Sequence, residues 1–133
     1  MNLSSGIDLI EIDRIQKALE RHGERFLKRV FTDAELAPLR TKNIKTAQPR
    51  VIAAELAARF AAKEACSKAL GTGIGPVSWK DMEIVNEHSG KPTLRLSGRA
   101  AQIANFLGYT TWSVSLTHSQ DMAAAVVVCV GEG

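Results

Sequence analysis

The chain has 133 residues, enough for one domain with a core but too few for separate cofactor and substrate domains. Its 17 basic and 14 acidic residues give a mildly basic balance, so the placement of charge matters more than its sum. No uncharged apolar stretch of about 18 residues occurs, and residues 1–5 lack the pattern of an export signal, so we expect a cytoplasmic protein without a membrane segment. Cys66 and Cys129 lack CxxC or zinc-ligand spacing and are expected to be reduced core thiols.

The first elements are predicted from a change in hydrophobic period. Residues 6–12 are rich in isoleucine and leucine and predict a strand. From Asp13 the period becomes helical, with an apolar side that consists of Ile15, Leu19, Phe26 and Val30. Another side carries a basic stripe, which consists of Arg14, Lys17, Arg21, Arg25 and Lys28. The stripe is continuous if one helix runs through Gly23, and it is divided if glycine breaks the helix there.

The middle of the chain predicts a short capped helix, a loop and one long helix. Residues 32–35 form a helix start in which Thr32 or Asp33 supplies the capping oxygen, and Pro38 follows closely. Residues 40–50 are polar and basic and predict a loop that separates two halves of one domain. Residues 51–70 contain eight alanines, which favour a helix and close packing, and Gly71 ends it.

The last part of the chain predicts two hairpins around a short helix. Residues 82–86 and 93–96 flank the turn residues 88–91, and residues 99–107 form a helix that Gly108 stops. Residues 110–118 and 122–130 form the final hairpin, whose second strand is almost wholly apolar and suits a central position. The whole pattern predicts a single domain over residues 1–133 of class α+β, with one long helix packed on a mainly antiparallel sheet.

Two acidic residues, one in an apolar strand and one on a helix, indicate a site for a metal ion and a phosphate group. Asp8 lies in an apolar strand, where a carboxylate is costly to bury unless a cation or donors hold it. Glu64 and Lys68 are one helical turn apart, so one helix face presents an acid for a hard cation and an amine for a phosphate. The alternative is that Asp8 is a partly exposed strand acid, and that Glu64 and Lys68 form a weak surface ion pair.

The order of several motifs carries a resemblance to a known family. The motifs are residues 6–15, residues 31–36, residues 59–73, Gly90-Lys91-Pro92 and residues 115–118. In this order and spacing the chain resembles the holo-acyl-carrier-protein synthases, which are 4'-phosphopantetheinyl transferases. The resemblance spans nearly the whole chain, and residues 41–50 are longer than in that family. It implies the 4'-phosphopantetheinyl transferase fold and a homotrimer with sites between subunits.

The resemblance implies transfer of the phosphopantetheine arm of coenzyme A to a serine of apo acyl carrier protein for fatty acid biosynthesis. Adenosine 3',5'-bisphosphate is released. By this resemblance Asp8 and Glu64 are magnesium ligands and belong to the catalytic set. Glu64, directly or through a water on the metal, is expected to accept the serine proton, and Lys68 to stabilise charge on the departing bisphosphate. Neither a nucleic acid nor a membrane is an expected partner.

The coenzyme-binding residues that the resemblance implies are Arg59, Lys68, Gly71, Lys91, Pro92 and His118. Three of these residues, Arg59, His118 and Gly71, also have an interpretation in which their role is structural. Arg59 has Glu55 one turn away as an ion-pair partner, and His118 at a strand end is more often a structural histidine. Gly71 serves first as the cap of the preceding helix.

The basic stripe supplies the predicted docking surface for the carrier protein through Arg14, Arg21 and Arg25. Acyl carrier proteins are acidic around the modified serine, so these cations would steer association. A solvated helix face is the alternative. Two other functions stay open at this point. One is a small basic domain that binds nucleic acid or an acidic protein without catalysis, and the other is a transferase for peptide-synthesis carrier domains, whose known members resemble two fused copies of this unit.

Overall fold

The computed structural model describes residues 1–41 and 48–132. The first half of the chain consists of β1 (Asn2–Glu11), α1 (Ile12–His22), α2 (Glu24–Val30), α3 (Asp33–Thr41) and α4 (Pro49–Leu70). The second half consists of the short 3₁₀ helix η1 (Trp79–Asp81), β2 (Met82–Asn86), β3 (Pro92–Leu96), α5 (Gly98–Leu107), β4 (Thr111–His118) and β5 (Met122–Gly131). The predicted class α+β is confirmed.

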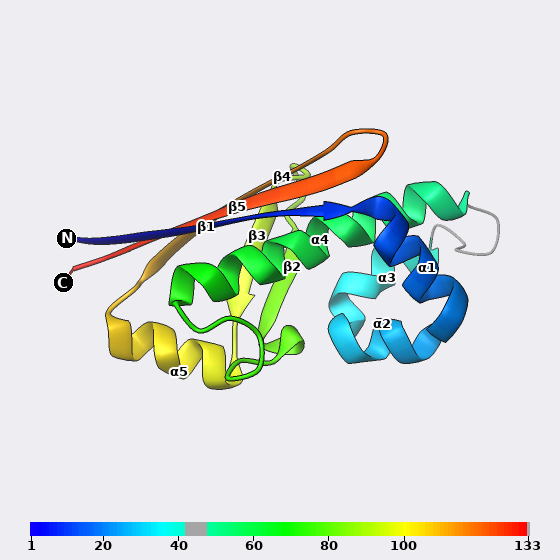
Figure 1. Ribbon diagram of the computed structural model, residues 1–133. Coiled ribbons are helices and arrows are strands. Elements are labelled where there is room, and N and C mark those ends of the chain that lie inside the picture. The colour runs from blue at the N-terminus through cyan, green and yellow to red at the C-terminus, as the bar shows by residue number, and fades with distance from the viewer. Residues whose placement is uncertain (42–47, 133) are drawn as a thin grey trace.

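The main sheet has three antiparallel strands in the order β1-β5-β4 (Figure 1). The apolar strand β5 lies in the centre, as predicted. Its alternate residues Ala123, Ala125, Val127 and Cys129 are buried on one face. Asp8 pairs with Ala125 in the register, so its side chain belongs to the same face as that buried row. β2 and β3 form a second, separate two-stranded sheet.

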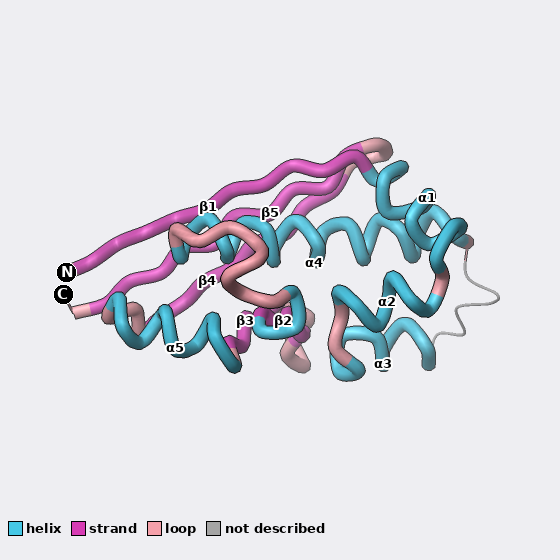
Figure 2. Tube along the Cα trace, turned by 60° about the horizontal axis from the view of Figure 1, so that its bottom comes forward, coloured by secondary structure: helices cyan, strands magenta, loops and turns pink. Residues whose placement is uncertain are grey.

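Helix α4 lies along the inner face of the main sheet, between the sheet and a second layer that contains α2, α3, α5 and the β2–β3 hairpin (Figure 2). Its alanines permit a close approach, and Ala53, Ala57, Ala61 and Ala65 are fully buried. Gly6 of β1 sits where a Cβ would overlap the Ala65 carbonyl oxygen and lie 2.9 Å from the Ala69 nitrogen. Only glycine allows β1 and α4 to pack this closely.

Gly23 divides the amphipathic segment into α1 and α2. It has φ 50° and ψ −125°, a conformation that glycine adopts without steric cost, so the broken-helix alternative is the correct one. At the next helix start Thr32 is the cap. Its hydroxyl accepts from the Glu35 N–H at 3.2 Å, and the Glu35 carboxylate accepts from the Thr32 N–H at 2.9 Å.

Several predicted bounds were wrong. Ile12, expected in the first strand, begins α1, where it is buried with Ile15 on the apolar side of the helix. The strand extends back to Asn2 because Asn2 pairs with Gly131 at the far end of the sheet. The loop predicted over residues 40–50 is shorter at both ends, since α3 runs to Thr41 and α4 begins at Pro49, which is suited to a first helical turn. The rest of that loop falls on residues 42–47, outside the described residues.

Both cysteines are buried and unpaired, as predicted. Burial is the main cause that raises the pKa of the Cys66 thiol to about 12, so it stays a neutral core side chain. Within residues 1–41 and 48–132, no helix is long and apolar enough to cross a membrane. That the whole sequence of 133 residues is a single domain stays a prediction.

Candidate functional site

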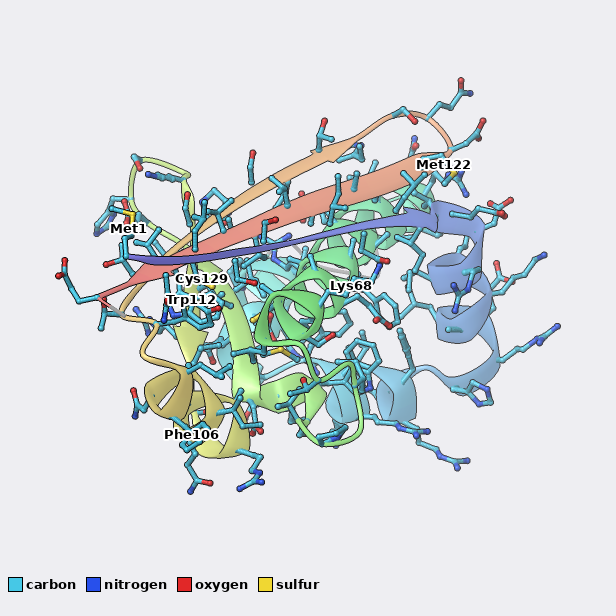
Figure 3. The ribbon with its side chains drawn as sticks, turned by 60° about the vertical axis from the view of Figure 1, so that its left-hand side comes forward. Met1, Lys68, Phe106, Trp112, Met122 and Cys129 are labelled. Carbon is cyan, nitrogen blue, oxygen red and sulfur yellow. The ribbon has the colours of Figure 1, made fainter. Side chains whose placement is uncertain are left out.

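Asp8, Glu64 and Lys68 come together where β1 lies against α4. The Lys68 Nζ atom donates to the Asp8 carboxylate at 3.2 Å and to the Ile7 carbonyl oxygen at 3.0 Å. The Asp8 side chain is 19% exposed, and that of Lys68 is 52% exposed. Figure 3 shows Lys68 on α4 close to β1. The amine that the sequence placed one turn from Glu64 thus forms its ion pair with Asp8.

The two carboxylates are close enough to act on each other. Burial is the largest cause that raises the pKa of Glu64, and the Asp8 charge raises it further, while Lys68 and Arg14 oppose both. Two half-buried acids that repel each other are stabilised by a cation between them. Magnesium in proteins uses one or two carboxylates and completes its shell with water and substrate phosphates, so this pair fits magnesium. No group of three or more candidate metal ligands was found in the described part of the chain.

A cavity of about 460 Å³ gathers most of the predicted coenzyme-binding residues. Arg59 reaches it from α4, Lys91 and Pro92 from the β2–β3 hairpin, and His118 from the end of β4. Three side chains that carry or can accept positive charge therefore share one concave surface. Such a surface suits a ligand with several phosphate groups.

Arg59, His118 and Gly71 were each given a structural alternative to coenzyme binding, and the structure supports these alternatives only in part. The Arg59 guanidinium donates to the backbone carbonyl of Glu55 at 3.1 Å, which orients it along α4 beside the cavity. The His118 ring has a long contact of 3.4 Å from Nδ1 to the Ser119 carbonyl oxygen and is exposed, so it is not a buried structural histidine. Gly71 caps α4 with φ 79°, and its N–H donates to the Lys68 carbonyl at 3.0 Å.

The basic residues of the predicted docking surface are exposed on two helices. Arg14 and Arg21 lie on α1, and Arg25 lies on α2. A cavity of about 400 Å³ opens at this surface, and its lining combines apolar residues with cations: Ala18, Phe26, Val30 and Trp79 with His22, Arg25 and Arg29. An amphipathic acidic helix has the complementary properties.

Within one chain the carboxylate pair and the cavity are separate. The described lining of the cavity contains Arg59 but not Asp8, Glu64 or Lys68. Arg59 and Glu64 are five positions apart on α4, which places them on different helix faces, at about 140°. The two groups of predicted site residues therefore face different directions.

Comparison with known proteins decides the family. Residues 4–127 match the model of the 4'-phosphopantetheinyl transferase superfamily. The chain belongs to this superfamily. The holo-[acyl-carrier-protein] synthase of Herpetosiphon aurantiacus is 48% identical over 136 aligned positions, which cover 97% of this chain and 99% of that protein. That of Moorella thermoacetica is 48% identical and covers 95% of this chain and 92% of that protein.

Solved structures of the superfamily have the same fold. The acyl carrier protein synthase of Plasmodium yoelii with ADP bound has a TM-score of 0.88 at 30% identity and covers 100% of both chains. The holo-[acyl-carrier-protein] synthase of Helicobacter pylori in complex with coenzyme A has a TM-score of 0.79 at 32% identity and covers 95% of this chain and 99% of that chain. The fold prediction is thus confirmed at the level of the superfamily.

This superfamily member also has site features that the sequence analysis missed. Glu35, Glu55 and Asn86 line the cavity, and Lys63 is buried beside Glu35. A periodicity signal existed for Lys63, because it shares a helix stripe with Leu56, Phe60, Ser67 and Leu70, at intervals of three and four residues. A lysine in an otherwise apolar or small stripe indicates a buried, paired ammonium.

In the described part of the chain, the outer face of the main sheet exposes an apolar row on β1 and β5. Leu3, Ile7 and Leu9 of β1 are 67%, 68% and 63% exposed. They pair in the register with Val130, Val126 and Ala124 of β5, which continue the same face. Exposed apolar patches of this kind mark interaction surfaces.

Proposed function

We propose that this chain is a magnesium-dependent holo-acyl-carrier-protein synthase. It transfers the 4'-phosphopantetheine group of coenzyme A to a serine of apo acyl carrier protein and releases adenosine 3',5'-bisphosphate, in support of fatty acid biosynthesis. The observation that carries the proposal is the pair Asp8 and Glu64 with Lys68 at the β1–α4 contact, in a chain that belongs to the transferase superfamily. Relatives with that name include the protein of Herpetosiphon aurantiacus.

Asp8 and Glu64 are the proposed magnesium ligands. Magnesium, when bound there, supplies positive charge that offsets the negative oxygens of the pyrophosphate. The raised pKa of Glu64 means that its carboxyl group retains a proton more readily than an ordinary glutamate, so metal and proton compete for it.

Proton transfer and charge stabilisation are the proposed roles of the α4 residues. The serine hydroxyl must lose its proton as its oxygen bonds to phosphorus, and the phosphorus–oxygen bond to the departing bisphosphate must break. Glu64, directly or through a water on the metal, is the proposed proton acceptor. Lys68 carries positive charge at the same place and stabilises the departing phosphate.

The cavity on the other side of α4 is the proposed site for the nucleotide end of coenzyme A. Arg59, Lys91 and His118 provide donors for its phosphates, and Pro92 provides an apolar surface for the base. Gly71, at the end of α4, is the remaining proposed contact. It lies next to Lys68 in space, since its N–H bonds to the Lys68 carbonyl.

A homotrimer explains how two separate half-sites become one. In such an assembly the carboxylates of one subunit would lie against the cavity of a neighbour. The apolar row of Leu3, Ile7 and Leu9 is suited to this contact. Each site would then contain residues from two chains.

Arg14, Arg21 and Arg25 are the proposed docking residues for the carrier protein. Arg25 lines the cavity that also includes Phe26 and Trp79, and Arg14 and Arg21 are exposed on α1, which contributes Ala18 and His22 to the same lining. Positive charges at the rim steer an acidic partner, and the apolar floor supplies binding energy once the partner is seated. Arg14 also acts on the Glu64 pKa, so docking takes place close to the carboxylate pair.

The test is a reconstituted reaction. The protein is incubated with coenzyme A, magnesium and apo acyl carrier protein, and the carrier protein is weighed by mass spectrometry. The expected result is a gain of one phosphopantetheine group that requires both coenzyme A and the serine. A lack of product, together with a steeply salt-dependent affinity for DNA or RNA, would instead support the nucleic-acid-binding alternative. A carrier domain of peptide synthesis, offered in parallel, tests the broader specificity. The cytoplasm stays the predicted compartment.

A further inference from the structure

A fully buried ion pair lies beside the cavity. The Lys63 Nζ atom is 2.7 Å from the Glu35 Oε1 atom, and both side chains are 0% exposed. Lys63 also donates to the backbone carbonyl oxygens of Trp79 at 3.0 Å and Met82 at 2.7 Å. The second Glu35 oxygen accepts from the Ile84 N–H at 3.0 Å. Each of these buried polar atoms therefore has a bonding partner.

Stability alone is a weak explanation for this pair. Removing two charges from water is costly, and apolar residues of similar volume often replace a buried ion pair without loss of stability. Burial is the largest cause that lowers the pKa of Lys63, and the Glu35 charge opposes it. The pair links four elements, because its hydrogen bonds join side chains of α4 and α3 to backbone atoms of η1 and β2.

The β2–β3 hairpin is not part of the main sheet, and these bonds tie it to α3 and α4 in addition to its packing against α4 and β4. Figure 2 shows it below α4, apart from β1 and β5. Lys91 at the end of its turn and Pro92 at the start of β3 line the cavity together with Arg59 of α4. Arg59 precedes Lys63 by one helical turn, so the helix that carries Arg59 also holds the hairpin through Lys63. Thr32 adds a bond to Glu83 of β2 at 2.7 Å.

We propose that Glu35 and Lys63 are positioning residues that hold Lys91 at the distance from Arg59 at which both bind the phosphates of coenzyme A. The inference rests on the proposed function of the cavity. A cation held in place before the ligand arrives loses less conformational freedom on binding, so the complex is tighter. The pair acts through the hairpin and makes no contact with the reacting atoms.

The test replaces the pair by apolar residues of similar volume in the double variant Glu35→Leu with Lys63→Met. We expect cooperative thermal unfolding, faster hydrogen exchange at residues 87–91, and coenzyme A binding about five- to tenfold weaker by calorimetry. In turnover the loss is expected in the KM for coenzyme A rather than in kcat. The matched control removes the exposed pair Glu24–Arg40 by Glu24→Leu with Arg40→Met and is expected to bind coenzyme A normally.

A double-mutant cycle separates this inference from the proposed function. Lys91→Ala is expected to weaken coenzyme A binding about tenfold in the wild type but less than twofold in the pair variant, because Lys91 is already displaced there. If Lys91→Ala weakens both backgrounds equally, or the pair variant folds and binds like wild type, the positioning role is wrong and the function of the cavity stands. If Lys91→Ala has no effect in the wild type, the role of Lys91 in the cavity is wrong, and the inference with it.

A single variant keeps the test decisive if the double variant does not fold. Glu35→Gln retains the shape of the side chain and removes its charge. It is expected to give the same faster exchange at residues 87–91 and at least a threefold weaker affinity for coenzyme A. Wild-type exchange and affinity in a folded Glu35→Gln protein would overturn the positioning role.

Discussion

The contact between Gly6 and α4 makes the distance between the two carboxylates testable. Gly6 is two positions before Asp8 on β1, and it faces Ala65, which follows Glu64 on α4. In Gly6→Ala the new Cβ would lie 2.8 Å from the Ala65 carbonyl carbon, whereas ordinary contacts begin at 3.4 Å. The strand must therefore move outward by at least about 0.6 Å, and more to clear the overlapping oxygen.

Both stability and turnover are expected to fall in Gly6→Ala. Forcing a methyl group against backbone costs about 3 kcal/mol, at the upper end for overpacking, which lowers the Tm by about 10 °C. A shift of this size at Asp8 is expected to reduce kcat about ten- to a hundredfold. Thermal unfolding and the rate of carrier-protein modification measure the two effects.

The control for this variant is Gly108→Ala. Its Cβ would meet only ordinary contacts, at 3.9 Å and beyond, but its φ of 82° makes the substitution strained. We expect a loss of about 1 kcal/mol and normal turnover per folded protein. A Gly6→Ala protein with wild-type Tm and kcat would refute the reasoning about the β1–α4 contact.

Three further predictions concern charge and assembly. Glu64→Gln is expected to abolish turnover at saturating magnesium and, without metal, to have a higher Tm than wild type at neutral pH. Because the pKa of Glu64 is raised in the folded protein, the stability of the wild type falls as the pH rises from the usual glutamate pKa through the raised one. The Tm difference between Glu64→Gln and wild type should therefore close at acidic pH. More magnesium should also be needed for half-maximal activity at acidic pH, because protons compete with the metal for Glu64. Arg14→Glu combined with Arg21→Glu should slow association with carrier protein about tenfold or more and reduce its salt dependence, while Arg99→Glu on α5 should not. Leu3→Glu should dissociate the proposed trimer in analytical ultracentrifugation and abolish turnover, since 67% of this leucine is exposed on the proposed interface.

Each of these has a contradicting result. Wild-type turnover of Glu64→Gln would exclude its proton-accepting role, and a Tm gap that widens at acidic pH would contradict the sign of its pKa change. An unchanged on-rate after the two charge reversals would show that the carrier protein docks elsewhere. A monomeric wild-type protein with full activity would remove the need for a shared site.

Local signals in the sequence were sufficient to predict most of the helices and strands. The alanine-rich segment that became α4 combines helix propensity with small size, and Gly71 and Gly108 end helices in the left-handed conformation that favours glycine. The Thr32 cap was one of two options, and the bonds between Thr32 and Glu35 select it. These features depend on residues close together in the chain, where propensity and capping decide the outcome.

Features that depend on distant partners were not predictable in the same way. The start of β1 at Asn2 follows from pairing with the last residues of β5, and the pattern of residues 2–5 alone does not predict it. Asp8 and Glu64 were predicted to share a site because the sequence motifs indicate one. That Lys68 forms its ion pair with Asp8 and not with Glu64 depends on how β1 crosses α4. The bonds of Lys63 to Trp79 and Met82 likewise arise only in the fold.

The amine of Lys68 has one more consequence, because β1 is an edge strand. An edge carbonyl without a partner can recruit a strand from another molecule, and the bond from Lys68 to Ile7 occupies one such group at 3.0 Å. Truncating Lys68 therefore exposes a backbone acceptor as well as removing a charge. Aggregation of a Lys68→Ala preparation would reduce its measured rate without any change in the chemistry, so soluble, correctly assembled protein must be quantified before the rate is interpreted.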